Sequence, residues 1–298
     1  MGRIYCPPAG SRYVPPMLPL IELGGLRTGS PLHLAPANSF PGASYTPALA
    51  SLAVRHRLVS LALPGLGPDP GSAPLTPTSW SDLGERIAEA FAEHGLTEVI
   101  AVGHSFGAVA SLVAAARHPE RIRALCLLDP TMVNERQMDQ IFFRDELGRR
   151  QHRLAVQARE RRTHFASADE AYATWRSKRL FHDWSDELLR HFVSTALRPA
   201  GNGSGLTLIW PADWEAHYYE GFYYESWTEL ERLDLRIPVL VVRGGETDVF
   251  TLGSVERFRS IRPSATMVDV LGYGHLFPQA APEQTGKVIR EWLVRIDG

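Results

Sequence analysis

The pentapeptide Gly103–Gly107 reads Gly-His-Ser-Phe-Gly and has the spacing G-x-S-x-G. The apolar segment Glu98–Val102, which we predict to be a strand, precedes it, and the small-residue segment Ser105–Arg117, which we predict to be a helix, begins at its serine. A strand that turns into a helix within one residue holds that serine in a strained conformation, and glycines on either side avoid collisions there. Ser105 is therefore a candidate nucleophile, and the next backbone N–H, that of Phe106, points at the same space.

A serine hydroxyl is a poor nucleophile at neutral pH and needs a base, which is usually a histidine held by a carboxylate. The chain has 11 histidines, so position must select among them. His275 lies in the loop Gly272–Pro278, after the last predicted strand, Ala265–Leu271. Open α/β sheets bind ligands at the C-terminal ends of their strands, so this loop can deliver His275 to Ser105.

Three acidic residues compete to hold that histidine. Asp248 and Glu246 lie in the loop after the predicted strand Pro238–Val242, and Asp129 directly follows the predicted strand Ile122–Leu128. All three therefore fall at the same edge of the sheet as Ser105. We favour Asp248, and we expect Asp129 to cap the start of the segment that follows it.

Strands and helices alternate along most of the chain, which predicts βαβ units and an α/β fold with a mostly parallel central sheet flanked by helices. The other predicted strands are Leu18–Leu23, Pro31–Ala35 and Arg57–Leu63, and the other predicted helices are Ser79–His94, Leu252–Ile261 and Ala281–Ile296. Ser79 is a plausible N-cap for the first of these helices.

The exception is the stretch 131–230, which is rich in arginine and glutamate and has helical periodicity without a convincing strand. We expect an irregular N-terminal arm over 1–16, a core built from 17–130 and 231–298, and an inserted helical cap over 131–230. Acidic residues are interspersed among the arginines between 149 and 162, which favours a solvated helix face over an anion-binding site. Apolar pockets are largely aromatic, so candidate pocket residues are Trp210, Trp214, Tyr218 and Phe277.

With these motifs in place, the chain resembles the α/β-hydrolase fold family over about residues 17–130 and 231–298. The resemblance implies that Ser105 is the nucleophile, Asp248 the orienting acid and His275 the general base. It also implies an oxyanion hole formed by the backbone N–H groups of Phe40 and Phe106. The family's first oxyanion loop usually reads His-Gly, whereas this chain has Asn-Ser at 38–39, so the register of that loop is open by a residue.

The resemblance implies a serine esterase that needs no cofactor or metal and cleaves carboxylic esters of apolar, moderate-size substrates through an acyl-enzyme. One fold hosts many chemistries, so C–C, thioester, lactone or amide hydrolysis and acyl transfer are alternatives at the same site. A small-molecule receptor that retains the three residues is a further alternative from a different class. The sequence contains no G-x-x-x-x-G-K, H-E-x-x-H or C-x-x-C motif.

The composition excludes several other classes of protein. The formal net charge is −2, so the chain lacks the basic footprint of a nucleic-acid binder. Its two cysteines are too few for a disulfide scaffold, and Cys126 lies in an apolar run, where we expect a reduced, buried thiol. No apolar stretch approaches the roughly 18 residues of a membrane span, and the proline-broken N-terminus lacks a secretory signal, so we expect a cytoplasmic protein.

Overall fold

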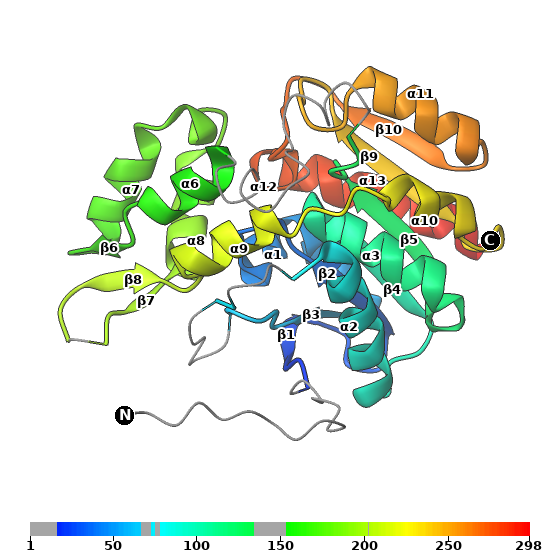
Figure 1. Ribbon diagram of the computed structural model, residues 1–298, viewed down its shortest axis with the longest axis horizontal. Coiled ribbons are helices and arrows are strands. Elements are labelled where there is room, and N and C mark those ends of the chain that lie inside the picture. The colour runs from blue at the N-terminus through cyan, green and yellow to red at the C-terminus, as the bar shows by residue number, and fades with distance from the viewer. Residues whose placement is uncertain (1–16, 67–72, 75–77, 134–152, 202) are drawn as a thin grey trace.

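The central sheet of the protein contains seven strands in the order β1-β3-β2-β4-β5-β9-β10 (Figure 1). The structure is a computed structural model that describes residues 17–66, 73–74, 78–133, 153–201 and 203–298. The strands are β1 (Leu20–Gly25), β2 (Ser30–Ala35), β3 (His56–Leu61), β4 (Val99–His104), β5 (Ile122–Leu128), β9 (Val239–Gly244) and β10 (Thr266–Val270). Only β1 pairs antiparallel to its neighbour, so the predicted, mostly parallel α/β fold is confirmed.

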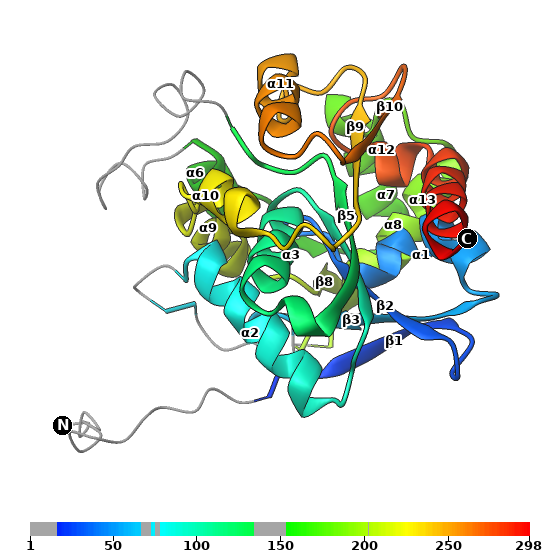
Figure 2. The ribbon, with the colours of Figure 1, turned by 90° about the vertical axis from the view of Figure 1, so that its right-hand side faces the viewer.

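Helices cover both faces of this sheet (Figure 2). On one face lie α2 (Trp80–Glu93), α3 (Phe106–Arg117), α10 (Ser226–Arg232) and α11 (Leu252–Ile261), and on the other lie α1 (Thr46–Leu49), α12 (Phe277–Ala280) and α13 (Pro282–Asp297). Alternate side chains of β4 pack into two separate apolar cores. Val99 and Ala101 lie in the first, and Ile100 and Val102 lie in the second. A strand covered on both faces needs such a continuous apolar run, which is why its sequence showed no polar alternation.

The segment between β5 and β9 adds a second group of elements, beside the main sheet in Figure 1. Its described helices are α6 (Arg153–Glu160), α7 (Ala168–Arg176), α8 (Asp186–Ala196) and α9 (Ala212–Glu220), followed by α10. Two of them begin with a serine N-cap: Ser167 accepts from the N–H of Glu170, and Ser185 accepts from the N–H of Leu188. Four aromatic side chains of this segment, Trp175, Phe181, Trp184 and Phe192, pack together.

The expectation that this segment contains no strand is wrong. It holds a small antiparallel sheet in the order β6-β8-β7, from β6 (His164–Phe165), β7 (Leu197–Pro199) and β8 (Leu206–Leu208). These strands are two or three residues long, too short for alternation of polar and apolar residues to emerge above the surrounding helical pattern. The boundaries predicted for the arm, core and cap remain a proposal, and residues 1–16 and 134–152 lie outside the described residues.

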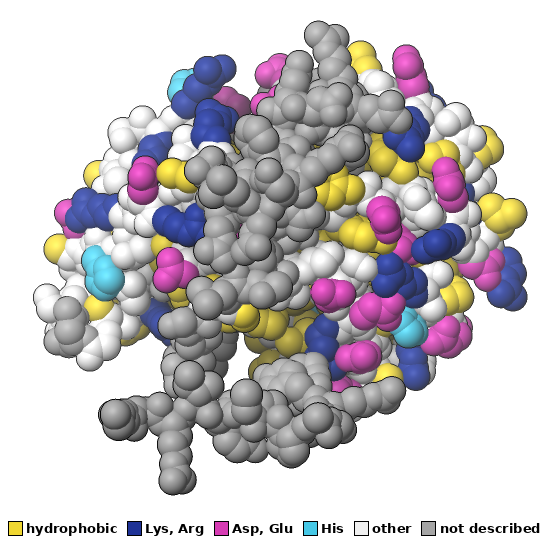
Figure 3. Space-filling view, viewed as in Figure 1, with side chains coloured by type: hydrophobic (Ala, Val, Ile, Leu, Met, Phe, Trp, Pro, Cys, Tyr) yellow, Lys and Arg dark blue, Asp and Glu magenta, His cyan; other side chains and the backbone are white. Residues whose placement is uncertain are grey.

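Opposite charges are interspersed on the face of the molecule drawn in Figure 3, where arginine and lysine side chains lie among aspartates and glutamates. In the segment rich in arginine, Arg161 pairs with Glu215 of α9, and Arg162 pairs with Glu170. Because these two arginines are paired with glutamates of the chain, the contacts favour a structural role for them over an anion-binding site. Within the described ranges, no helix is both long and apolar enough to cross a bilayer.

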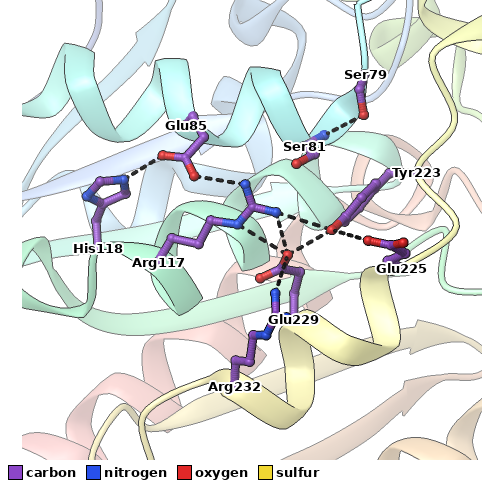
Figure 4. A network of polar contacts seen from close by, with 9 residues as sticks. All are labelled: Ser79, Ser81, Glu85, Arg117, His118, Tyr223, Glu225, Glu229 and Arg232. Carbon is purple, nitrogen blue, oxygen red and sulfur yellow. Dashed lines mark hydrogen bonds and ion pairs between the residues drawn. The ribbon is translucent and has the colours of Figure 1, made fainter.

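A polar network fastens α10 to α2 and α3 (Figure 4). The guanidinium of Arg117, in the last turn of α3, lies between Glu229 of α10 (2.5 Å) and Glu85 of α2 (2.8 Å). Glu229 is fully buried and also accepts from the hydroxyl of Tyr223 at 2.8 Å. Burial alone would raise the pKa of Glu229, but its contacts with Arg117 and Tyr223 outweigh burial and lower that pKa below its ordinary value.

Replacing Glu229 with glutamine should lower the free energy of unfolding by about 2 kcal/mol, because the buried Arg117 contact loses its counter-charge and its charge-assisted hydrogen bond. Chemical denaturation at pH 7 measures the loss. Glu225→Gln is the control: Glu225 is exposed and contacts the same Tyr223 hydroxyl, at 3.3 Å, so its replacement should change stability by less than about 0.5 kcal/mol. Equal losses in both variants would contradict a stabilising role for the buried pair.

Candidate active site

Ser105 lies at a sharp turn between β4 and α3, as the G-x-S-x-G spacing predicts. Its backbone angles are φ 60° and ψ −122°, a conformation that non-glycine residues rarely adopt. A Cβ on Gly103 would come within 2.5 Å of the Cα of Ala108, and a Cβ on Gly107 within 2.4 Å of the carbonyl oxygen of Ala35. Both glycines are therefore required by close backbone approach, and the turn carries the serine side chain to the C-terminal end of β4.

His275 reaches this serine from the loop between β10 and α12. Its Nε2 lies 3.0 Å from the Oγ of Ser105. Its Nδ1 lies 2.6 Å from the Oδ2 of Asp129. The structure therefore brings together Ser105 and His275, two of the three residues expected from the sequence, within proton-transfer distance.

The carboxylate that holds His275 is Asp129, and the expectation of Asp248 in this position is wrong. Both ring nitrogens of His275 are accounted for by Ser105 and Asp129, while Asp248 and the alternative Glu246 are exposed. The sheet order explains the difference. β5 lies directly beside β4, so a residue at the end of β5 is adjacent to the nucleophile, whereas β9 is one strand further away.

Asp129 is fully buried, and both of its carboxylate oxygens accept hydrogen bonds. Its Oδ2 accepts from the hydroxyl of Thr247 (2.5 Å) as well as from His275, and its Oδ1 accepts from the N–H of Gly244 (3.2 Å). Asp129 has φ 41°, and its N–H donates to Val242 of β9. The loop expected to supply the acid thus contributes Thr247, which orients the carboxylate.

The backbone N–H groups of Phe106 and Phe40, expected to form the oxyanion hole, differ in whether they already have a hydrogen-bond acceptor. The N–H of Phe106 is the first in α3 and, like the other N–H groups of a first helical turn, has no acceptor within the helix. The N–H of Phe40 donates to the carbonyl of Ala37 at 3.0 Å and closes a turn in which Ser39 has φ 65°. Phe40 is therefore not a free donor here, which corrects the expectation from the sequence. A glycine would adopt the positive φ of Ser39 without strain, as in the usual His-Gly pair.

His104, beside the nucleophile, joins the first oxyanion loop to the loop of His275. Its Nε2 donates to the backbone carbonyl of His275 (2.9 Å), so its Nδ1 accepts from the hydroxyl of Tyr45 (2.6 Å). That hydroxyl accepts in turn from the N–H of Ala37 (2.9 Å). Burial, with a contribution from the nearby His275, lowers the pKa of His104 well below its ordinary value, so this side chain stays neutral and positions the loop.

The four aromatic residues predicted to line the pocket gather around the residues that flank Ser105. The ring of Tyr218 lies 5.4 Å from that of Phe106, and the ring of Phe277 lies 6.4 Å from that of His104. Trp210 and Trp214 pack against Tyr218 at 5.8 and 5.9 Å. All four are buried, and contact with a substrate remains a prediction for each of them.

Sequence reasoning missed three residues of the site: Thr131, Thr247 and Tyr45. The hydroxyl of Thr131 lies 3.1 Å from that of Ser105. The closeness of Thr131 to a strand end was a signal for it, but hydroxyl residues are common in such loops and carry little information alone.

Among the described residues, no three His, Cys, Asp or Glu side chains are grouped so that they could hold a metal ion.

The fold that carries these residues is found in known proteins. The family model described as alpha/beta hydrolase fold matches residues 37–278. The chain is similar to the structure of E-2-(acetamidomethylene)succinate hydrolase, with a TM-score of 0.76 and 21% identity over 93% of this chain and 94% of that one. It is also similar to a thermophilic esterase from Thermogutta terrifontis, with a TM-score of 0.64 and 20% identity over 94% and 93% of the two chains.

A third structural neighbour is the thioesterase domain from the curacin biosynthetic pathway, with a TM-score of 0.67 and 17% identity over 89% of this chain and 92% of that one. A search of curated proteins found no match to the sequence. At these levels of identity the structural neighbours show the fold alone, whereas the family model covers most of the chain. The chain therefore belongs to the α/β-hydrolase fold family.

Proposed function

We propose that the chain is a serine hydrolase that cleaves carboxylic esters of apolar, moderate-size substrates through an acyl-enzyme, with Ser105, His275 and Asp129 as its catalytic triad. The observation that carries the proposal is the continuous contact from Ser105 Oγ through both ring nitrogens of His275 to a fully buried carboxylate. A buried acid with that geometry fixes the histidine tautomer and stabilises the imidazolium that forms during the reaction.

In the acylation step, Nε2 of His275 accepts the proton of Ser105 as its Oγ bonds to the ester carbonyl carbon. The carbonyl oxygen becomes an oxyanion, which the N–H of Phe106 stabilises at the positive end of α3. Nε2 then gives its proton to the leaving alcohol as the carbon–oxygen bond breaks, and the acyl group stays on Ser105. Water repeats the sequence: it gives a proton to His275, attacks the acyl carbon and releases the acid, and Ser105 regains its proton.

The substrate class rests on the surroundings of Ser105. Phe106, Tyr218, Trp80 and Phe277 pack near the elbow and make the surroundings of Ser105 largely aromatic, which favours an apolar acyl or alcohol group. The names of the neighbours, a hydrolase, an esterase and a thioesterase, agree with acyl-group chemistry on this fold. A cytoplasmic location and a small-molecule substrate complete the proposal.

Replacing Ser105 with alanine should abolish both the hydrolysis of p-nitrophenyl esters and covalent labelling by a fluorophosphonate, because the attacking oxygen is gone. Ser111→Ala is the matched control, since Ser111 is a buried serine of the same helix, and this variant should keep both activities. A panel of thioesters, lactones, amides and C–C substrates then ranks the chemistries against p-nitrophenyl esters.

Unchanged ester turnover in Ser105→Ala would end the esterase proposal. Tight binding of small molecules by a wild-type protein that shows no turnover and no labelling would instead indicate a receptor built on the same fold. A preference for thioesters or amides by more than about tenfold in kcat/KM would keep Ser105 as the nucleophile and replace the substrate class.

A further inference from the structure

The hydroxyl of Ser105 has a second side-chain partner besides His275. The Oγ1 of Thr131 lies 3.1 Å from the Oγ of Ser105, and the Nε2 of His275 lies 3.0 Å from the same atom. Thr131 is only two residues beyond Asp129, so one short turn after β5 carries both the acid and this hydroxyl. The Thr131 residue is partly exposed.

The other contacts of the triad decide which hydroxyl donates. A carboxylate only accepts, so the contact at 2.6 Å with Asp129 makes Nδ1 of His275 the protonated nitrogen. Nε2 of the neutral ring is then an acceptor, and the single hydrogen of the Ser105 hydroxyl goes to it. The Thr131 hydroxyl is therefore the donor in its contact with Ser105, and it points a hydrogen at the atom that reacts.

Backbone contacts hold Thr131 in this position. The N–H of Ser105 donates to the carbonyl of Leu128 (3.0 Å), and the carbonyl of Ser105 accepts from the N–H of Thr131 (3.3 Å). The N–H of Met132 donates to the carbonyl of Pro130 (2.7 Å) and tightens the turn. The turn 128–131 thus contacts Ser105 through its N–H, its carbonyl and its side-chain oxygen, and the backbone of Thr131 is held beside the nucleophile.

We propose that Thr131 is a fourth catalytic residue, whose hydroxyl stabilises negative charge on the Oγ of Ser105. The inference rests on the proposed function, in which that oxygen is the nucleophile. Thr131 keeps its own proton throughout. In acylation the Ser105 O–H bond breaks, the proton goes to Nε2 of His275, and Oγ carries increasing charge until its bond to the acyl carbon is complete.

The same hydrogen bond acts again in deacylation. As the bond from the acyl carbon to Oγ breaks, charge returns to Oγ until His275 protonates it. The Oγ of an acyl-enzyme is an ester oxygen and a weak acceptor, so the hydrogen bond from Thr131 is weak in the intermediate and strong on both sides of it. Stabilisation that is larger in the transition states than in the ground states accelerates both steps.

Thr131→Val keeps the shape of the side chain and removes the hydroxyl, so it tests the proposal directly. A charge-assisted hydrogen bond corresponds to roughly a 10- to 100-fold effect on rate. We expect both the rate of fluorophosphonate labelling and the kcat for p-nitrophenyl esters to fall by this factor, with KM changed less than about twofold. Thr131→Ser, which keeps the hydroxyl, should stay within about threefold of wild type.

Two further variants control for packing. Thr131→Ala, which cannot crowd the turn, should lose as much activity as Thr131→Val. Thr174→Val removes a hydroxyl from an equally half-buried threonine of α7, whose Oγ1 donates to the carbonyl of Glu170, and should leave the rates unchanged. The pH at which kcat/KM falls on the acid side should stay the same in all variants, because His275 and Asp129 keep their contact.

Wild-type rates of labelling and turnover in Thr131→Val would overturn the proposal while leaving Ser105 as the nucleophile. A shifted pH profile in Thr131→Val would also overturn it, because the effect would then be a displacement of His275. The proposed function fails in a different way, by the absence of labelling in wild type or by its persistence in Ser105→Ala.

Discussion

Replacing Asp129 with asparagine should lower kcat for ester hydrolysis by about 10⁴-fold, although it changes a single atom. Oδ1 of Asp129 accepts from the backbone N–H of Gly244, which can only donate, whereas the Thr247 hydroxyl on the Oδ2 side can rotate and accept, so the carbonyl oxygen of an asparagine takes the Gly244 side. Its NH₂ group is then directed at Nδ1 of His275, which must become an acceptor. The histidine adopts the other tautomer, with its hydrogen on Nε2, and loses the ability to take the proton of Ser105.

Asp248→Asn is the matched control for this prediction. Asp248 is exposed, and its neighbour Thr247 already donates to the buried carboxylate of Asp129, so neutralising Asp248 should change kcat by less than about threefold. Steady-state kinetics with p-nitrophenyl esters and circular dichroism spectra of both variants provide the measurement. A large loss in Asp248→Asn, with Asp129→Asn close to wild type, would reinstate Asp248 as the acid.

The elbow and the base could be predicted from the sequence because local rules determine them. Glycine is needed at 103 and 107 because a side chain there would collide with nearby backbone atoms. The strand and the helix on either side have about the expected lengths. His275 follows the last strand of the sheet, and any loop at the C-terminal end of a parallel sheet faces the same edge. Neither inference needed the order in which the strands are paired.

The choice of acid did need that order. Asp129 and Asp248 both follow strands that end at the same edge, and their distances along the chain from Ser105 say nothing about which strand is adjacent to β4. The pairing of β4 with β5 places Asp129 closer, and its carboxylate reaches Nδ1 of His275. Strand order is a tertiary property, because it depends on how the whole sheet packs against its helices.

Two other errors have the same origin. The strands β6, β7 and β8 form only because they meet one another, since two or three residues have no strand signal of their own. The N–H of Phe40 is hydrogen-bonded because Ser39 takes a positive φ in the turn. Non-glycine residues rarely adopt that conformation, so a serine in the sequence does not predict it as a glycine would. The rest of the core was predictable because apolar periodicity reports burial directly.

A second large effect is expected at His33 in β2, which takes no part in the proposed chemistry. Its side chain is 1% exposed, and both ring nitrogens lack a hydrogen-bond partner among the described residues. The ring packs edge-on against Phe91 of α2 at 4.9 Å, an apolar neighbour that cannot stabilise a charge on it. Burial therefore lowers the pKa of His33 to about 3.

The sign of the pH dependence follows from this shift. Below about pH 6.5 His33 is protonated in the unfolded chain, whereas in the folded protein it stays neutral down to about pH 3. Acid therefore favours unfolding between these two pH values. Each pH unit within it costs about 1.4 kcal/mol of stability. His104 is also fully buried, with its pKa lowered, and adds to the same trend. The protein should therefore lose stability steeply between pH 6.5 and pH 4.

His33→Leu isolates the contribution of one ring. At pH 7 the variant should be more stable by about 1–2 kcal/mol, because two unpartnered polar atoms leave the core. At pH 4 the advantage should grow by about a further 3 kcal/mol, because leucine binds no proton in the unfolded state. Urea denaturation at both pH values measures this difference. His182→Leu, at an exposed position, should follow the wild-type pH dependence, and a His33→Leu variant that did the same would show that His33 is not buried in the neutral form.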